Sequence, residues 1–341
     1  MTNFIRNILI FIIVPTIVLL FIIVPYFIKD PYLDYGKKEN YSWTYFFQQL
    51  GDISTKKLIN STQEYNSFVF GSSRTTGIYA CYLNQSIPNS SFYHYGNWNE
   101  TIGGIYNKLQ LIDSLGYKIE NVLIYLDTDY TFKGEGKSHI SDHYLISKQS
   151  KFNYLKTHFT SFYSNLTLKK LKILYGFKID GTDFPNWHSD LKTNDPNHNC
   201  NDPKTILNYS LYDDSEILSA KIDSLKSSNI LFNRQLHEEY LEEQISDSEK
   251  SMLIKIRELL KKHSTNYYFV ITPLYDQKKF NISDQIKLVE LFGDRVFDFS
   301  GINEYTANEY NYPDGKHFQP YISKCIIDSI IKVGTYNFSN K

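Results

Sequence analysis

The chain has 341 residues, with 36 lysines and arginines against 37 aspartates and glutamates, so its formal net charge is −1. A balance this close to zero argues against a nucleic-acid-binding protein, which usually carries a basic excess. Its three cysteines, Cys81, Cys200 and Cys325, are few and odd in number, which argues against a disulfide framework. One bridge is possible in an oxidising compartment, but the sequence does not select the pair.

An apolar segment at residues 8–28 predicts a transmembrane helix, because about 20 apolar residues span a bilayer core of roughly 30 Å. Arg6 precedes the segment, and the tendency of positive charge to stay inside predicts a cytoplasmic N-terminus. No small-x-small cleavage site follows, which favours an uncleaved signal anchor over a cleaved signal peptide. The remainder of the chain is then expected outside the cytoplasm, in the periplasm or at the cell surface.

A stalk and a lead-in helix are expected over residues 29–64. Strands are then predicted to alternate with helices, which indicates a parallel sheet covered by helices on both faces. These expected elements are strands at 67–70, 91–95 and 121–126, with helices at 76–83 and 101–115. In such a sheet, sites form at the carboxyl ends of the strands. We therefore expect one crevice to hold the segments Gly71-Ser72-Ser73, Gly96-Asn97 and Asp127-Thr128-Asp129.

The pattern changes between residues 133 and 265, where we expect a mostly helical insertion. It contains a predicted helix at 152–174 and a long charged helix or helical pair at 233–262. The insertion is interpreted as a lid or a docking element, or else as a structural elaboration. The sheet is then expected to resume, with strands at 267–272 and 295–299 and helices at 282–292 and 320–333.

The expected organisation follows the chain from end to end. It comprises a cytoplasmic N-terminus (1–7), a transmembrane signal anchor (8–28), a stalk and lead-in helix (29–64), the first half of an α/β domain (65–132), an insertion or lid (133–265), the second half of the domain (266–334) and a tail (335–341).

Two short motifs almost 250 residues apart carry the chemistry. Gly71-Ser72-Ser73 follows a buried strand, and Asp314-x-x-His317 precedes the last helix. Together they supply a nucleophile, a base and an orienting carboxylate, the three roles of a serine acyl-transfer site. A helix starting just after Ser73 would also point its N-terminal amides at a developing oxyanion.

In these motifs the chain resembles the SGNH (GDSL-like) hydrolase superfamily, over residues 65–130 and 265–332. It is most similar to the membrane-anchored branch that includes the teichoic acid D-alanyl transfer protein and the alginate O-acetylation proteins. The resemblance implies a doubly wound, flavodoxin-like sheet, with Ser73 as nucleophile, His317 as base and Asp314 as its partner. It further implies acyl-ester chemistry on an envelope polysaccharide, no cofactor or metal, and a membrane-bound acyl carrier or transferase as a partner.

A tetrahedral intermediate needs two or three hydrogen-bond donors around its oxyanion. The Ser73 amide is the natural first donor, and the resemblance implies Gly96 as the second. The family's third donor is an asparagine after the third strand, but this chain has Asp127-Thr128-Asp129 there. A carboxylate donates only when protonated. The remaining candidates for a third donor are Asn97, Asn99 and Thr128.

Arg74, directly after the nucleophile, is a candidate for binding an anionic group of the substrate. Alternatively it pairs with a carboxylate of its own chain. Asp127 and Asp129 are accordingly expected either to hold Arg74 or to bind substrate.

Two rival functions stay open at this stage. One is a non-catalytic binding or scaffold protein that kept the fold, which the unusual third-strand segment permits. The other is an enzyme that cleaves phosphodiesters or glycans, which would need a metal cluster or paired carboxylates. His139-x-x-Asp142-His143 has ligand residue types at helical spacing, but no third metal ligand is evident.

Overall fold

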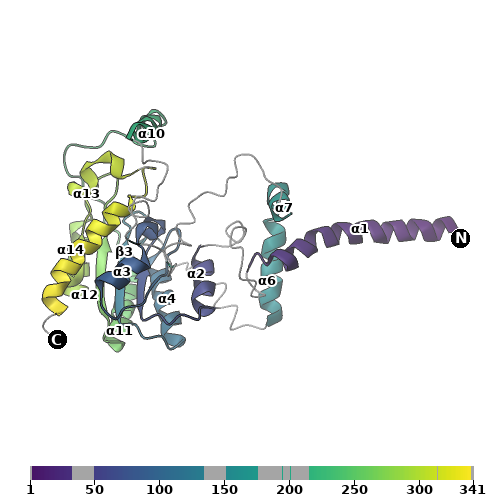
Figure 1. The fold of residues 1–341 in the computed structure, drawn as a ribbon, viewed down its shortest axis with the longest axis horizontal. Coiled ribbons are helices and arrows are strands. Elements are labelled where there is room, and N and C mark those ends of the chain that lie inside the picture. The colour runs from purple at the N-terminus through teal and green to yellow at the C-terminus, as the bar shows by residue number, and fades with distance from the viewer. Residues whose placement is uncertain are drawn as a thin grey trace. The chain divides into compact units, whose positions relative to one another are not determined.

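The computed structural model describes residues 2–32, 50–133, 151–175, 194, 200, 215–312 and 314–338. The chain divides into two compact units, one formed by residues 1–56 and 142–187, the other by residues 57–141 and 188–341. We call the second unit the sheet domain and describe each unit by itself (Figure 1).

The sheet domain is built on five parallel strands in the order β2-β1-β3-β4-β5. The strands are β1 (Ser67–Phe70), β2 (Phe92–His94), β3 (Asn121–Leu126), β4 (Asn266–Ile271) and β5 (Val296–Asp298). In the register, Ser67 of β1 pairs with Phe92 on one side and with Asn121 on the other. This is the strand order of flavodoxin-like sheets. The prediction of a parallel α/β sheet is confirmed.

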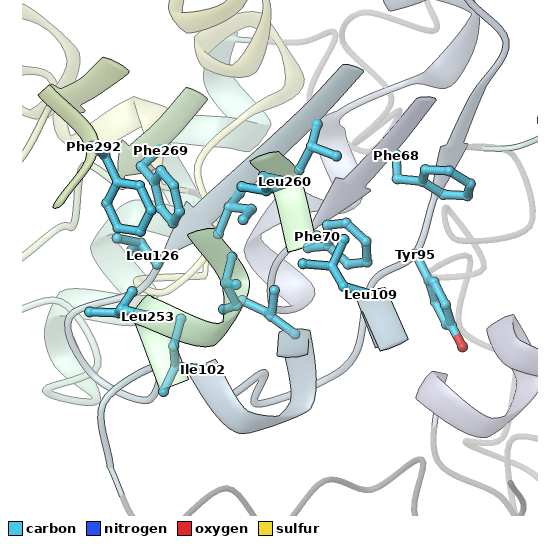
Figure 2. Packing of buried hydrophobic residues seen from close by; sticks show 14 of the residues in the cluster. Phe68, Phe70, Tyr95, Ile102, Leu109, Leu126, Leu253, Leu260, Phe269 and Phe292 are labelled. Atoms are coloured by element: carbon cyan, nitrogen blue, oxygen red, sulfur yellow. The ribbon is translucent and has the colours of Figure 1, made fainter. Parts of the chain in front are cut away.

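One face of the sheet is covered by three helices, α4 (Ile102–Ser114), α11 (Asp247–Lys262) and α12 (Ile282–Phe292). Alternate residues of each strand point to this face, as the twofold repeat of a strand requires. Figure 2 shows the side chains from the strands and helices packed together, and the rings of Phe269 and Phe292 have centroids 4.0 Å apart. Because Leu253, Ile256 and Leu260 are buried here, α11 belongs to the sheet domain. The insertion expected at 133–265 therefore does not include this helix.

The opposite face is covered by α3 (Ala80–Ser86), α14 (Pro320–Phe338) and residues of α10 (Ser215–Ser227). The intervening strand residues, among them Val69, Leu123 and Val270, point this way and are buried. Helices thus flank both faces, and the carboxyl ends of the strands are left for the loops that carry the predicted motifs.

The remaining elements of the sheet domain are short. They are the 3₁₀ turns η2 (Ser73–Gly77), η3 (Gly293–Arg295) and η4 (Glu309–Asn311), and the helix α13 (Glu304–Ala307); α2 (Leu50–Ile59) contains the boundary between the two units. The helix expected at 76–83 is therefore replaced by a 3₁₀ turn and the later helix α3. Ile78 and Tyr79 have extended backbone conformations and separate the two.

A disulfide joins Cys81 of α3 to Cys200, which lies 119 residues later in the chain, with the two Cα atoms 6.1 Å apart. Cys325 is free. Close to this bridge in sequence, the Asn194 side chain accepts a hydrogen bond from the His94 amide at 2.7 Å and donates one to the His94 carbonyl at 3.0 Å. Asn194 therefore satisfies two backbone groups of β2, the edge strand of the sheet.

In the other unit, α1 (Thr2–Lys29) contacts the helices α6 (Lys151–Ser164) and α7 (Leu168–Leu174). The 24 residues Arg6–Lys29 of α1 are long and apolar enough to cross a membrane, and few of them are buried. Its carboxyl-terminal end packs on α6 and α7, which run across it (Figure 1). The segment 152–174, expected to be helical, forms these two helices, with a break at Asn165, Leu166 and Thr167.

Candidate active site

The structure brings Ser73, His317 and Asp314 into one hydrogen-bonded chain. Ser73 Oγ lies 2.8 Å from His317 Nε2, although the two residues are 244 positions apart. His317 Nδ1 lies 2.6 Å from Asp314 Oδ2. All three side chains are only partly buried, so the site is open to solvent. The arrangement matches that of a nucleophile, a general base and the carboxylate that orients the base.

The turn that carries Ser73 follows directly from β1. Ser72 caps the 3₁₀ turn, and its hydroxyl oxygen accepts a hydrogen bond from the Arg74 amide at 3.1 Å. A Cβ atom on Gly71 would come within 3.0 Å of the Tyr125 Cβ and closer still to Thr75. Glycine is therefore required here for the strand to reach the turn. The Arg74 and Thr75 amides both bond within the turn, which leaves the Ser73 amide as its candidate oxyanion donor.

The loop between η4 and α14 fixes the other two members of the site. Asp314 Oδ1 accepts hydrogen bonds from the Lys316 amide at 2.9 Å and the His317 amide at 2.7 Å, which folds the loop around the carboxylate. Gly315 has a φ of 73° and lies against Ile230 and Leu231. Burial alone would raise the pKa of the Asp314 carboxyl, but its hydrogen bonds with His317, the charge of that residue and the Lys316 amide bring the net pKa below its usual value. Asp314 is thus ionised at neutral pH and holds Nδ1 in its protonated form.

Arg74 links the nucleophile turn to this loop. Its Nε donates to the carbonyl of Lys316 at 2.9 Å, and its Nη2 lies 2.7 Å from Asp129 Oδ2. Its Nη1 lies 3.4 Å from Asp127 Oδ2. Burial would lower the pKa of the guanidinium, but the two carboxylates outweigh this effect and raise it. The Arg74 side chain is therefore engaged by its own chain on three sides, which was one of the two expectations for it.

Asp127 lies inside the protein rather than at an open surface. It accepts hydrogen bonds from the Ser72 hydroxyl and, at 2.7 Å, from the Thr272 hydroxyl of the segment after β4. Its own amide donates to Thr131 Oγ1 at 2.8 Å. By contrast, Asp129 keeps 36% of its side chain exposed and remains the member of the pair that can meet a substrate.

The segment after β2 lies beside the nucleophile turn, because the Asn97 amide donates to the Gly71 carbonyl at 3.1 Å. The Asn97 side chain is buried, and its Oδ1 accepts from the Trp98 amide. The Asn97 backbone amide is therefore already engaged, whereas Gly96 lies next to it as the expected second donor. Thr128 is the remaining hydroxyl candidate for a third donor, since its buried Oγ1 has no hydrogen-bond partner among the described residues.

His94 contacts the turn that carries Ser73 through Thr75. The sequence analysis missed this role. His94 Nε2 lies 2.8 Å from Thr75 Oγ1, and that hydroxyl donates to the Ser72 carbonyl at 2.7 Å. Because the Thr75 hydroxyl already donates its proton to the Ser72 carbonyl, it can only accept from His94. In a neutral ring, His94 Nε2 is therefore the protonated nitrogen. Burial, aided by the charge of Lys108, lowers the pKa of His94 to about 3. A Cβ on Gly96 would come within 2.7 Å of His94 Cε1, so this ring also explains the glycine.

A buried ion pair, also missed, supports the segment after β2. The fully buried Lys108 of α4 pairs with Glu100 and donates to the carbonyls of Tyr95 at 3.0 Å and Gly96 at 3.1 Å. The ammonium also lies 4.6 Å from the centre of the Tyr95 ring. The sequence signal for this ion pair was Lys108 on the apolar side of a predicted helix, eight residues after Glu100.

No group of three or more potential metal ligands occurs among the residues that the structure describes. His139, Asp142 and His143 lie outside those residues.

Comparison with known proteins identifies no family for the chain. No family model matches it, and no curated protein matches it either. The resemblance to SGNH hydrolases consequently stays a prediction that depends on the two motifs.

Proposed function

We propose that this protein is a membrane-tethered, extracytoplasmic serine acyl-ester enzyme of SGNH type, an esterase or an O-acyltransferase. The observation that carries the proposal is the hydrogen-bonded chain from Ser73 Oγ through His317 to Asp314. The flavodoxin-like strand order and the apolar helix α1 support the fold and the tether, respectively.

In the first half of the reaction, Ser73 Oγ attacks the acyl carbon of an ester while His317 Nε2 takes the hydroxyl proton. The oxyanion forms within reach of the Ser73 and Gly96 amides. The intermediate collapses, the ester C–O bond breaks, and the leaving alkoxide takes the proton back from His317. An acyl-Ser73 ester remains.

In the second half, a water molecule or a sugar hydroxyl attacks the acyl-Ser73 ester, and His317 removes its proton. Collapse of this intermediate returns the proton to Ser73 Oγ. The products are a free acid in the first case and an acylated polysaccharide in the second. Asp314 stabilises the positive imidazolium in both halves. A membrane-bound acyl carrier or transferase is the partner that would deliver the acyl group.

The test is labelling of the full chain with a fluorophosphonate, followed by peptide mass spectrometry. We expect one adduct on Ser73, no adduct in Ser73→Ala, and loss of at least 100-fold in labelling rate in His317→Ala. Ser72→Ala distinguishes the two neighbouring serines. It should slow labelling, because the Ser72 hydroxyl caps the turn and donates to Asp127, but it should leave the adduct on Ser73. An adduct on Ser72, or labelling that persists without His317, would overturn the proposal.

One observation favours a second candidate, a non-catalytic scaffold protein of an envelope-polymer modification system. Asp127, in the segment that holds the third oxyanion donor in the resembled family, is engaged by Ser72, Arg74 and Thr272. A scaffold would keep its cellular function without a nucleophile. Polymer acylation that is unchanged in cells carrying Ser73→Ala would therefore favour the scaffold over the enzyme.

A further inference from the structure

The helices α6 and α7, in the unit that contains α1, carry lysines together with exposed apolar side chains. Residues 151–175 contain five lysines and no aspartate or glutamate, in a chain with 37 acidic residues. Several large apolar side chains of this segment are exposed, namely Phe152, Tyr163 and Leu168, the last by 78%. We call residues 151–175 the basic segment.

The basic segment contacts α1 at two places along that helix. The ring of Tyr175 stacks on that of Phe21 with centroids 4.5 Å apart, and its hydroxyl donates to the Phe21 carbonyl at 2.6 Å. Tyr26 of α1 packs on Phe159 and Phe162 of α6, with centroids 5.5 and 5.2 Å away. Tyr175, directly after α7, therefore contacts α1 nearer to its N-terminus than α6 does.

Phe21 lies well inside the apolar span. The span ends at Lys29, eight residues later (29 − 21), which is about 12 Å along a helix. A bilayer core needs only about 20 of the 24 residues. Even if the four extra residues (24 − 20) all protruded at this end, Phe21 would lie roughly 6 Å below the surface of the hydrocarbon core.

We propose that the basic segment lies in the membrane interface, with α6 and α7 across the end of α1. Its exposed apolar side chains would enter the acyl region, and its lysines would bind anionic lipid headgroups. This proposal rests on α1 spanning the membrane, as in the proposed function, and is independent of the acyl chemistry. Helices with large apolar and lysine side chains and no acidic residues bind such surfaces. The excess of positive charge favours anionic lipid over a second protein as the occupant.

The test uses the full chain in vesicles of phosphatidylcholine with one quarter phosphatidylglycerol, in a Cys325→Ser background. A fluorophore is attached at Leu168→Cys, with Leu19→Cys on α1 as the reference for lipid and Ile282→Cys on α12 as the reference for the sheet domain; all three side chains are more than half exposed. Lipids with a spin label near the headgroup end of the acyl chain act as quenchers. We expect quenching at 168 to be at least half of that at 19, and several-fold above that at 282.

Each other outcome has a distinct meaning. Quenching at 19 without quenching at 168 overturns the interface proposal and leaves the tether intact. A label at 168 that is shielded from both lipid quencher and aqueous iodide indicates a protein partner and also overturns it. Absence of quenching at both 168 and 19 shows that the tether itself has failed.

The lysines are tested by the same label in vesicles with and without phosphatidylglycerol. We expect quenching at 168 to rise about twofold with the anionic lipid, and Lys172→Gln to reduce that rise. Lys118→Gln, an exposed lysine of the sheet domain, is the matched control and should leave the rise unchanged. Equal quenching in both lipids would overturn the role of the headgroups.

Discussion

Arg74 connects two segments of the proposed active site that are far apart in the sequence. It follows Ser73 in the chain, and its Nε holds the carbonyl of Lys316, the residue before His317. Asp127 and Asp129 hold the guanidinium in place. A small movement of a catalytic group costs much rate, because the nucleophile and base must stay aligned. Arg74 is thus a positioning residue for the proposed reaction.

We expect Arg74→Lys to slow fluorophosphonate labelling of Ser73 by roughly 10–100-fold, since a lysine ammonium cannot reach Lys316 and both carboxylates as a planar fork does. The loss should fall on the maximal labelling rate and not on the concentration of probe at half-saturation. Arg257→Lys, a partly exposed arginine of α11 paired with Glu258, should have no effect. Half-saturation that rises while the maximal rate is kept would instead indicate binding of the probe by Arg74.

His94 makes a separate prediction about pH. Its native pKa of about 3 lies below the usual value of 6.5, so between these values the unfolded chain binds a proton that the native protein excludes. The contribution of His94 to stability is therefore complete above pH 6.5 and is lost as the pH falls towards 3. Between pH 7.5 and 5.0 this amounts to roughly 2 kcal/mol of unfolding free energy.

We expect His94→Gln to remove this part of the pH dependence, measured by urea unfolding of the full chain at the two pH values. His237→Gln is the control, because His237 is largely exposed. An equal fall in stability for the wild type and for His94→Gln would contradict a buried neutral imidazole.

At the scale of elements, the strands were the most predictable part of the fold. β1 and β3 begin and end at the predicted residues, because a short apolar run bounded by polar residues is a strong strand signal. The ends of the helices were harder to predict than those of the strands. The long charged helix or helical pair expected at 233–262 is one helix, α11, which begins only at Asp247, where Ser246 and Glu249 form a capping box. That spacing was present in the sequence, so this boundary could have been predicted.

The site divides in the same way. Ser73, Asp314 and His317 could be proposed because each lies in a short motif with known chemistry. The network around Arg74 could not, because its partners Asp127 and Lys316 are 53 (127 − 74) and 242 (316 − 74) residues away and have no local signal. The contact between His94 and Thr75 likewise depends on the pairing of β1 with β2.

The disulfide between Cys81 and Cys200 anchors α3, the helix that packs next to the edge strand β2. It closes a loop with a sequence separation of 119 residues, for which chain entropy predicts roughly 3–5 kcal/mol of stabilisation. We expect a reducing agent to lower the urea midpoint of the wild type and of Cys325→Ser, but not that of Cys81→Ser/Cys200→Ser. A midpoint that reduction leaves unchanged in the wild type would contradict this role.

At the scale of the whole molecule, two independent observations bear on the compartment. A helix near the N-terminus is long and apolar enough to cross a membrane. The sheet domain contains a disulfide, and stable disulfides form mainly in oxidising compartments outside the cytoplasm. Both observations support the proposed topology, in which the sheet domain lies outside the cytoplasm and the residues before Arg6 lie inside.

We therefore expect opposite accessibility for two single cysteines in a Cys325→Ser background. Ile282→Cys, on an exposed position of α12, should react with a membrane-impermeant maleimide on intact cells. Phe4→Cys, before Arg6, should react only after the membrane is permeabilised. The Cys81–Cys200 bridge keeps those two sulfurs unreactive, so the signal reports the introduced thiols alone. Reaction of Phe4→Cys on intact cells, with Ile282→Cys protected, would place the proposed active site in the cytoplasm and exclude an envelope polysaccharide as its substrate.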